Sequence, residues 1–325
     1  MKVVDLHCDT VLGLLEHEEG IHDKELSIDA NKLKEGDYLL QCFALFTDQK
    51  VNKIPEIQTM KLMDRYYRML EENKEILAPV YQFSDIEKNR KSGKISTLLT
   101  LEDGGVVFNE LAMLRNYYRM GVRLITLTWN YENGIGYPNV ASTSFTDYSV
   151  VDAKQQVDTV HGLTEFGKAY VKEMERLGII VDVSHLNDAG FWDVVKLSTK
   201  PFVASHSNAR SICNVARNMS DEMILALKEK GGVMGLNFCA SFLKKNSSLS
   251  AIEDMVKQIL YIRNLAGIDV IALGTDFDGI SCELEIKDCS QIQKLKYALQ
   301  EAGLTQEEIE KVFYKNALRV FKQVL

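Results

Sequence analysis

The most constraining feature of this chain is a repeated alternation of short apolar runs with longer amphipathic stretches. Each run is rich in Val, Ile or Leu, as expected of strands that are buried on both faces of a sheet. The eight predicted strands are Val3–Leu6, Leu39–Phe46, Ile95–Leu101, Leu124–Thr128, Ile179–Val183, Phe202–Ala204, Gly232–Leu236 and Val270–Leu273. Strands that alternate with helices build parallel sheets, so the chain predicts either a closed barrel or an open doubly wound sheet.

Two observations favour the closed barrel. No G-x-G-x-x-G motif follows the first predicted strand, which argues against the dinucleotide-binding form of an open sheet. Eight strand–helix units in a chain of 325 residues match the size of an α/β protein with a (β/α)8 TIM barrel. Because no long Pro/Gly/Ser linker interrupts the chain, we expect residues 1–325 to form one such domain.

The stretches between the strands carry helical patterns. Leu163–Leu177 has an apolar face and is followed by Gly178, a residue type that commonly ends helices. Ala251–Ala266 repeats this pattern, and Lys53–Leu77 predicts one long helix. The C-terminal part, Lys287–Val320, predicts two or three extra helices packed on the outside of the barrel.

Composition narrows the choice of partners and location. The formal net charge is -8, whereas nucleic-acid binding needs a basic face, so we expect no nucleic-acid partner. No run of about 18 apolar residues is present, and we expect no membrane span. The N-terminus lacks the apolar run of a secretory signal, which favours a cytoplasmic location. The six cysteines form no C-x-x-C pair, and we expect reduced, structural thiols.

Five of the eight predicted strands end on a histidine or a carboxylate. These residues are His7 and Asp9, Glu102 and Asp103, Asp182 and His185, His206, and Asp276 and Asp278. Active sites of (β/α)8 barrels form where the strands end, from residues of several strands. Histidines and carboxylates that converge there suit zinc or another divalent first-row ion. The set is larger than one tetrahedral ion needs, and two ions that share a carboxylate would use it.

The histidines support a metal site only when they are considered together. A single histidine at a strand end is more often a hydrogen-bonded core residue than a ligand, and a carboxylate there often caps the next helix. However, three of the six histidines fall directly at strand ends, which favours ligands. We expect the other three, His17, His22 and His161, to be solvated, since they lie in polar or helix-entry segments.

Ordered motifs along the chain resemble those of one enzyme family. They are DLHCDT at Asp5–Thr10, LEDGG at Leu101–Gly105, GLTEFG at Gly162–Gly167, DVSH at Asp182–His185, SHS at Ser205–Ser207, ARN at Ala216–Asn218, MGLNF at Met234–Phe238 and GTDFDG at Gly274–Gly279. In these residues the chain resembles the membrane (renal) dipeptidase family, peptidase family M19, of amidohydrolase-like metallopeptidases. The resemblance spans nearly the whole length, so it is more specific than any one motif.

The resemblance implies a dipeptidase with two zinc ions per chain in a barrel of the metal-dependent hydrolase type. The implied ligands are Glu102 bridging both ions, His7 and Asp9 on one ion, and His185 and His206 on the other. A hydroxide bridging the ions would attack the peptide carbonyl, and Asp276 would move the proton to the leaving amine. Arg217 would bind the carboxylate of the dipeptide. Other divalent first-row metals suit the same ligands.

One position departs from the family pattern. Vertebrate members carry a histidine after a Leu-Thr pair, whereas here Trp129 and Asn130 follow Leu127 and Thr128. We expect metal binding to be unaffected and treat Trp129 and Asn130 as candidate substrate-binding residues. The loss of one oxyanion donor lowers the rate of an enzyme by about 100- to 1,000-fold, so substrate choice is open at this position.

The sequence leaves two other functions open. One is a related two-metal barrel hydrolase acting on another small amide or lactam, which the Trp129 departure favours. The other is a catalytically silent homologue that binds a metal or a ligand. Carboxylates beside the predicted ligands, Asp103, Asp182 and Asp278, are candidates for orienting them. A homodimer is expected by family analogy alone.

Overall fold

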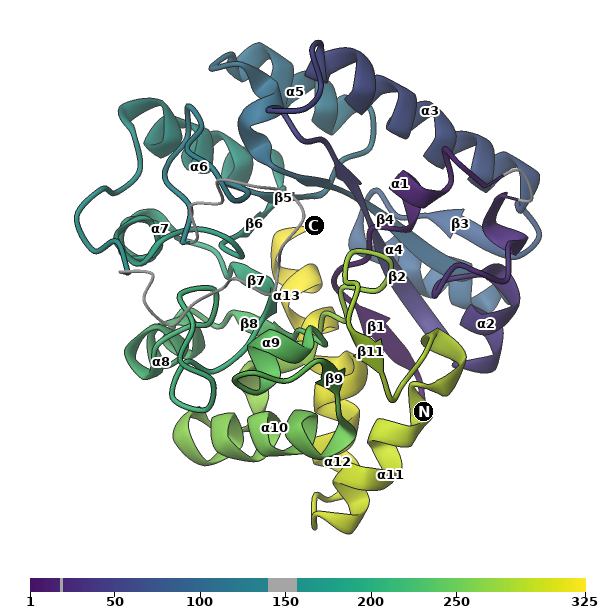
Figure 1. Ribbon diagram of the computed structural model, residues 1–325. Coiled ribbons are helices and arrows are strands. Elements are labelled where there is room, and N and C mark those ends of the chain that lie inside the picture. Colours follow the sequence, from purple (N-terminus) through teal and green to yellow (C-terminus); the bar gives the residue numbers. More distant parts are fainter. Residues whose placement is uncertain (18–19, 140–156) are drawn as a thin grey trace.

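The computed structural model of the protein describes residues 1–17, 20–139 and 157–325. Within these residues, eight parallel strands pair in a closed ring that helices surround (Figure 1). In ring order the strands are β1 (Val3–Asp5), β2 (Tyr38–Phe46), β4 (Ile95–Glu102), β5 (Leu124–Thr126), β6 (Ile180–Asp182), β7 (Val203–Ser207), β8 (Val233–Leu236) and β10 (Ile271–Leu273). The predicted (β/α)8 barrel is confirmed, with strand bounds that differ by a few residues.

Two long-range pairings close the ring. Strand β2 pairs with β4, which aligns Phe46 with Glu102, and β1 pairs with β10 through Asp5 and Leu273. Because the paired strands all run parallel, their C-terminal ends meet at one mouth of the barrel. Side chains at the ends of distant strands therefore become neighbours.

Helices cover the outside of the ring. They are α1 (Thr10–Gly13), α2 (Ala30–Glu35), α3 (Pro55–Glu72), α4 (Phe83–Lys91), α5 (Leu111–Arg119), α6 (Glu165–Leu177), α7 (Asp188–Leu197), α8 (Asp221–Glu229), α9 (Ala240–Leu243), α10 (Ile252–Ala266), α11 (Gln293–Glu301) and α12 (Gln306–Glu310). Helix α6 confirms the first predicted helix. The Thr164 side chain accepts a hydrogen bond from the Gly167 N–H at its start, and Gly178 ends it with a φ of +82°. Helix α10 confirms the second.

The predicted helix Lys53–Leu77 is too long. Helix α3 ends at Glu72, and the chain then forms a short strand, β3 (Leu77–Pro79), which pairs with the start of β4. The Asn73 side-chain amide donates to the Met69 carbonyl at 2.9 Å, so it occupies an acceptor at the end of the helix. The charged residues in this segment continue the helical pattern, and only pairing with a distant strand reveals β3.

The last helix, α13 (Asn316–Val324), does not pack on the outside as predicted. In the view of Figure 1 it overlaps the centre of the ring, and its contacts place it at the N-terminal ends of the strands, where Arg319 donates to the carbonyls of Gly231 and Asp269 just before β8 and β10. Its buried side chains Ala317, Val320, Phe321 and Val324 join a cluster to which all eight ring strands contribute. That cluster includes Val4, Leu40, Leu98, Leu124, Ile180, Val203, Val233 and Ala272. An apolar face on a terminal helix fits either position, and α13 closes the N-terminal end of the barrel.

Smaller features complete the described part of the chain. Strands β9 (Leu249–Ser250) and β11 (Glu283–Leu284) form a two-stranded parallel sheet between the segments that follow β8 and β10. The six cysteines are free thiols, and five of them are buried. Among the described residues, no helix has the length and apolar character needed to cross a membrane.

Candidate metal centre and active site

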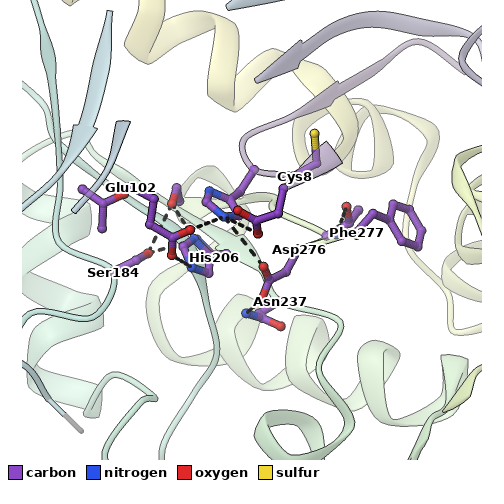
Figure 2. Close-up of polar contacts among 12 residues, drawn as sticks. Cys8, Glu102, Ser184, His206, Asn237, Asp276 and Phe277 are labelled. Atoms are coloured by element: carbon purple, nitrogen blue, oxygen red, sulfur yellow. Dashed lines mark hydrogen bonds and ion pairs between the residues drawn. The ribbon is translucent and has the colours of Figure 1, made fainter. Parts of the chain in front are cut away.

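Six predicted site residues gather at the mouth of the barrel. They are His7, Asp9, Glu102, His185, His206 and Asp276, and each is at most 9% exposed. They lie at or just beyond the ends of β1, β4, β6, β7 and β10. Figure 2 shows Glu102, His206 and Asp276 directed toward the same point. The barrel thus brings together residues that are up to 269 positions apart, from His7 to Asp276.

Glu102 lies between two groups of side chains. Its Oε2 is 3.3 Å from Nε2 of His7, and that nitrogen is 3.3 Å from Oδ2 of Asp9. Its Oε1 is 3.1 Å from Nε2 of His185 and 3.6 Å from Nε2 of His206. One carboxylate oxygen therefore faces each group, as required of a carboxylate shared by two cations.

The backbone at the mouth is irregular in ways that direct these side chains inward. His185 and Asp276 have φ values of +67° and +64°. Such a conformation costs a residue other than glycine about 1–3 kcal/mol and is found most often at functional sites. The pairing of β7 with β8 shifts register between Ala204 and Ser207, on either side of His206. Irregularities of this kind re-aim side chains beside active sites.

The buried nitrogen and oxygen atoms fit divalent cations. Nε2 of His185 and Nε2 of His206 are 3.0 Å apart. Burial lowers the pKa of both rings well below the usual value, which favours the neutral form that binds metals. Ligand atoms of His7, Glu102 and His206 lie within 4.8 Å of one another, as do those of His7, Asp9 and Asp276. Histidines and carboxylates at this spacing form a donor set suited to zinc.

The electrostatics of the mouth favour a bound cation as well. Burial, together with the charge of Asp9, raises the pKa of Glu102 to about 8. Burial also raises the pKa of Asp276 to about 7. Burial lowers the pKa of His7, but Glu102 and Asp9 together raise it well above its usual value. Crowded carboxylates that stabilise positive charge on a neighbour would stabilise a metal ion in the same way.

A cavity of about 190 Å³ opens onto these residues. The carboxylates of Asp9 and Asp276 line it, together with the guanidinium of Arg217. Phe46 and Trp129 contribute an aromatic wall. The volume is below the range of about 300–1,000 Å³ that is typical of drug-sized ligands, so the cavity suits a smaller molecule.

Of the three predicted substrate-binding residues, Arg217 and Trp129 line the cavity, whereas Asn130 contacts a predicted metal ligand. Arg217 is 3% exposed, and its guanidinium carbon lies 5.6 Å from the ring centroid of Phe242. The Trp129 ring is buried 4.9 Å from that of Phe46 and faces the cavity with it. Asn130 instead contacts His185, with its Oδ1 2.7 Å from the ring Nδ1. Asn130 therefore orients a predicted ligand, a role that its position after Trp129 did not indicate.

Two of the three neighbouring carboxylates hold loops. Asp103 accepts hydrogen bonds from Gln49 and Asn133, at 2.6 and 2.7 Å. Asp278 accepts from the Thr10 hydroxyl at 2.6 Å, which fixes the start of α1. Each links segments that are far apart in the chain, and Asp278 also lines the cavity beside the metal centre.

Sequence reasoning missed one residue that touches the predicted catalytic acid. The Asn237 side-chain amide donates to Oδ2 of Asp276 at 2.9 Å (Figure 2). Asn237 follows β8 directly, so the strand-end rule that selected the other residues would have found it if amides had been included. Of the remaining histidines, His22 and His161 are exposed as expected. His17 is half-buried and contacts Oδ2 of Asp23 at 2.6 Å.

Comparison with protein families and curated proteins gives a consistent result. The family model "Membrane dipeptidase (Peptidase family M19)" matches residues 1–325. A Klebsiella pneumoniae protein encoded in the pqqA 5′ region is 34% identical over 244 residues, covering 74% of this chain and 86% of that protein. The dipeptidase tcpJ of Claviceps purpurea is 28% identical over 267 residues, covering 82% of this chain but 60% of its own length.

Solved structures share the fold over its full length. A dipeptidase AC, described as a metallopeptidase of family M19, superposes with a TM-score of 0.90 at 24% identity, covering 100% of this chain and 98% of that one. A metallopeptidase from Rhodobacter sphaeroides superposes with a TM-score of 0.89 at 23% identity, covering 100% and 99%. At these identities the likeness supports the fold.

Proposed function

The chain belongs to the membrane dipeptidase family, peptidase family M19, and on that premise we propose that it is a zinc-dependent dipeptidase with two metal ions per chain. The observation that carries the proposal is the position of Glu102. Its two oxygens face separate groups of buried ligands, His7 with Asp9 and His185 with His206. A small cavity beside them holds an acid and a guanidinium.

Each residue has a role that follows from its chemistry. Bound at these five ligands, the metal ions would supply an activated water and polarise the peptide carbonyl. Asp276 lines the cavity, and burial raises its pKa to about 7, so it can accept and return a proton near neutral pH. The Asn237 amide donates to one of its oxygens, which orients the other toward the centre.

Arg217 explains why the substrate would be a dipeptide. Its guanidinium lines the same cavity as Asp276 and suits bidentate binding of a carboxylate. A carboxylate fixed this close to the reacting centre leaves room for only one peptide bond. The Rhodobacter sphaeroides structure is liganded with a phosphinate mimic of the dipeptide L-Ala-D-Ala, which supports a dipeptide in this chain as well.

The proposal is tested with protein loaded with stoichiometric zinc and a panel of L-L and L-D dipeptides. We expect hydrolysis of at least part of the panel. Asp276→Asn should keep its zinc but lose about 100- to 10,000-fold in rate, since it removes the proton carrier. If no dipeptide is hydrolysed, the proposal is wrong. If Asp276→Asn leaves hydrolysis intact, the role of Asp276 is wrong. Loading with cobalt, manganese or iron identifies the preferred metal.

A second function is favoured by one observation. Trp129 gives the cavity an apolar wall where vertebrate relatives place a histidine, and such a wall fits other small amides or lactams. A screen of those compounds with the same zinc-loaded protein separates the two functions. Hydrolysis of an amide or lactam without hydrolysis of dipeptides would favour the second. The one-domain organisation, the cytoplasmic location and the homodimer stay predictions.

A further inference from the structure

We propose that Asp182 and Ser205 form a positioning relay that keeps the ring proton of His206 on Nδ1 and directs its free Nε2 at the metal centre. The inference deepens the proposed function and rests on it, because His206 is taken there as a metal ligand. The contacts that form the relay lie within the protein chain. They are therefore testable without any metal or substrate.

The relay links two neighbouring strands. Asp182 ends β6 and Ser205 lies on β7. The Ser205 hydroxyl donates to Oδ2 of Asp182 at 2.5 Å, and the same Oγ lies 2.7 Å from Nδ1 of His206. All three residues are at most 1% exposed. Bulk water therefore does not compete for these hydrogen bonds.

Counting protons gives the direction of each bond. The Asp182 Oδ1 accepts from the Ser184 and Ser205 N–H groups, at 3.0 and 2.8 Å. Its Oδ2 accepts from the Thr126 hydroxyl at 2.6 Å in addition to Ser205. A carboxylate with four donors has no proton to give, so the single hydroxyl proton of Ser205 points at Asp182. The Ser205 oxygen then accepts from the Nδ1–H of His206, which leaves the lone pair on Nε2.

The irregularity of β7 makes this contact between adjacent residues feasible. Successive side chains of a regular strand point to opposite faces. The pairing of β7 with β8 shifts register between Ala204 and Ser207, so Ser205 and His206 escape that rule. Ser205 reaches inward to Asp182, while the ring of the next residue reaches the same centre.

His185 is held by a different partner. Oδ1 of Asn130 lies 2.7 Å from Nδ1 of His185 and accepts its ring proton. Two proton-free Nε2 atoms, of His185 and His206, then face each other at 3.0 Å. Both lone pairs are then directed at the same point, so Asn130 and the relay orient two ligands of one centre. A carboxylate stands behind His206 only, and carboxylate partners make a histidine a stronger ligand.

The test reads the ring nitrogens directly. Metal-free protein labelled with ¹⁵N-histidine contains six histidines, few enough for each ring to be assigned. In wild-type protein at neutral pH we expect the His206 shifts of an Nδ1–H tautomer. Ser205→Ala removes the acceptor, so the proton is expected to divide between both nitrogens and their shifts to converge.

Asp182→Asn makes a more specific prediction. The two backbone N–H groups need the oxygen of the new amide, so its nitrogen must face the hydroxyls of Thr126 and Ser205. Ser205 would then accept from the amide and donate to His206. The ring proton is expected to move to Nε2, the position that binds the metal. A side chain that only filled space would not reverse the tautomer.

Zinc affinity is the second measurement. Competition with a chelator should show a loss of about 10- to 100-fold for both variants. Ser184→Ala is the matched control. Ser184 is also buried, and its Oγ accepts from the backbone N–H of His206 at 3.0 Å and lies 3.4 Å from the Ser205 Oγ, but it does not touch the ring nitrogens. Its ring shifts and zinc affinity should match those of the wild type.

The outcomes separate this inference from the proposed function. Unchanged His206 shifts in folded Ser205→Ala protein overturn the relay, and so do equal changes in Ser184→Ala. Circular dichroism checks folding, and Ser205→Ala decides the matter if Asp182→Asn does not fold. If the tautomer responds as expected but wild-type protein hydrolyses no dipeptide, the relay stands and the proposed function fails.

Discussion

At the scale of single residues, Glu102 connects the two halves of the metal centre. Its oxygens lie 3.3 Å from His7 and 3.1 Å from His185, and the carboxylate is almost wholly buried. A buried carboxylate without a positive partner is costly, which is why burial raises its pKa to about 8. Metal ions on both sides would remove that cost.

The ligand assignment predicts a change in metal content. His185→Ala removes a ligand from one group only, so bound zinc is expected to fall by about one ion per chain while the other ion remains. Elemental analysis of dialysed protein measures this. His161→Ala, at an exposed histidine, is the control and should keep both ions. Full zinc content in His185→Ala would contradict the assignment.

The aromatic wall predicts substrate preference. Trp129→Ala removes the ring that faces the cavity beside Phe46. We expect kcat/KM for dipeptides with large apolar side chains to fall about tenfold or more relative to Gly-Gly, because apolar contact is lost. Tyr131→Phe is the control, since Tyr131 packs against Trp129 but its hydroxyl bonds to the Gln49 N–H. An unchanged ratio in Trp129→Ala would show that this wall does not contact the substrate.

At the scale of elements, the residues of the metal centre and the apolar residues that stabilise the barrel lie at opposite ends of the same strands. The metal centre lies where the strands end, and α13 packs its apolar side chains against the N-terminal ends of the ring strands. In (β/α)8 barrels, function is carried by the C-terminal ends of the strands and stability by the rest. Changes in α13 should therefore affect folding more than chemistry.

A substitution at Phe321 tests whether changes in α13 affect folding without affecting the metal centre. Its side chain is fully buried among residues of the ring strands, so Phe321→Ala is expected to lower the free energy of unfolding by about 3–5 kcal/mol. Urea denaturation measures the loss. Lys322→Ala, at the exposed neighbouring position, should have almost no effect. The folded fraction of Phe321→Ala should keep its zinc, and a loss of zinc at low temperature would argue against the separation.

At the scale of the whole molecule, the mouth of the barrel makes stability depend on pH. Burial raises the pKa of Glu102 to about 8 and that of Asp276 to about 7, so the folded protein holds protons that the unfolded chain releases. The pKa of His7 is raised as well, by Glu102 and Asp9 against the effect of burial. The stability that these groups contribute is present at lower pH and is lost as pH rises through their folded values.

We therefore expect metal-free protein to lose thermal stability between pH 6.5 and 8. Cys282 acts the other way, because Cys239 lowers the pKa of its thiol to about 6, but three groups outweigh one. His185 and His206, whose pKa values burial lowers, matter only below about pH 6.5. Thermal melts across this range measure the trend. Asp276→Asn should flatten it, and added zinc should reverse it, since metal ligands must be deprotonated. A rise in the melting temperature of metal-free protein would contradict the expectation.

Local patterns in the sequence were enough to predict most of the elements and the candidate ligands. Apolar runs mark buried strands because burial on both faces excludes polar side chains. Gly178 and Thr164 mark the ends of α6 because both act on backbone groups within one turn. The strand-end residues then followed from the rule that parallel strands end at one mouth.

Tertiary structure alone decided how distant residues meet. The strand β3, the position of α13 at the N-terminal end of the barrel and the contact between Asn130 and His185 all depend on pairings across long stretches of chain. The same holds for the relay from Asp182 through Ser205 to His206, which needs both the neighbouring strand and the irregularity in β7. Periodicity in a sequence records which side chains are buried and in what local conformation. It does not record the distances between buried side chains, and hydrogen bonds and metal ligation depend on those distances.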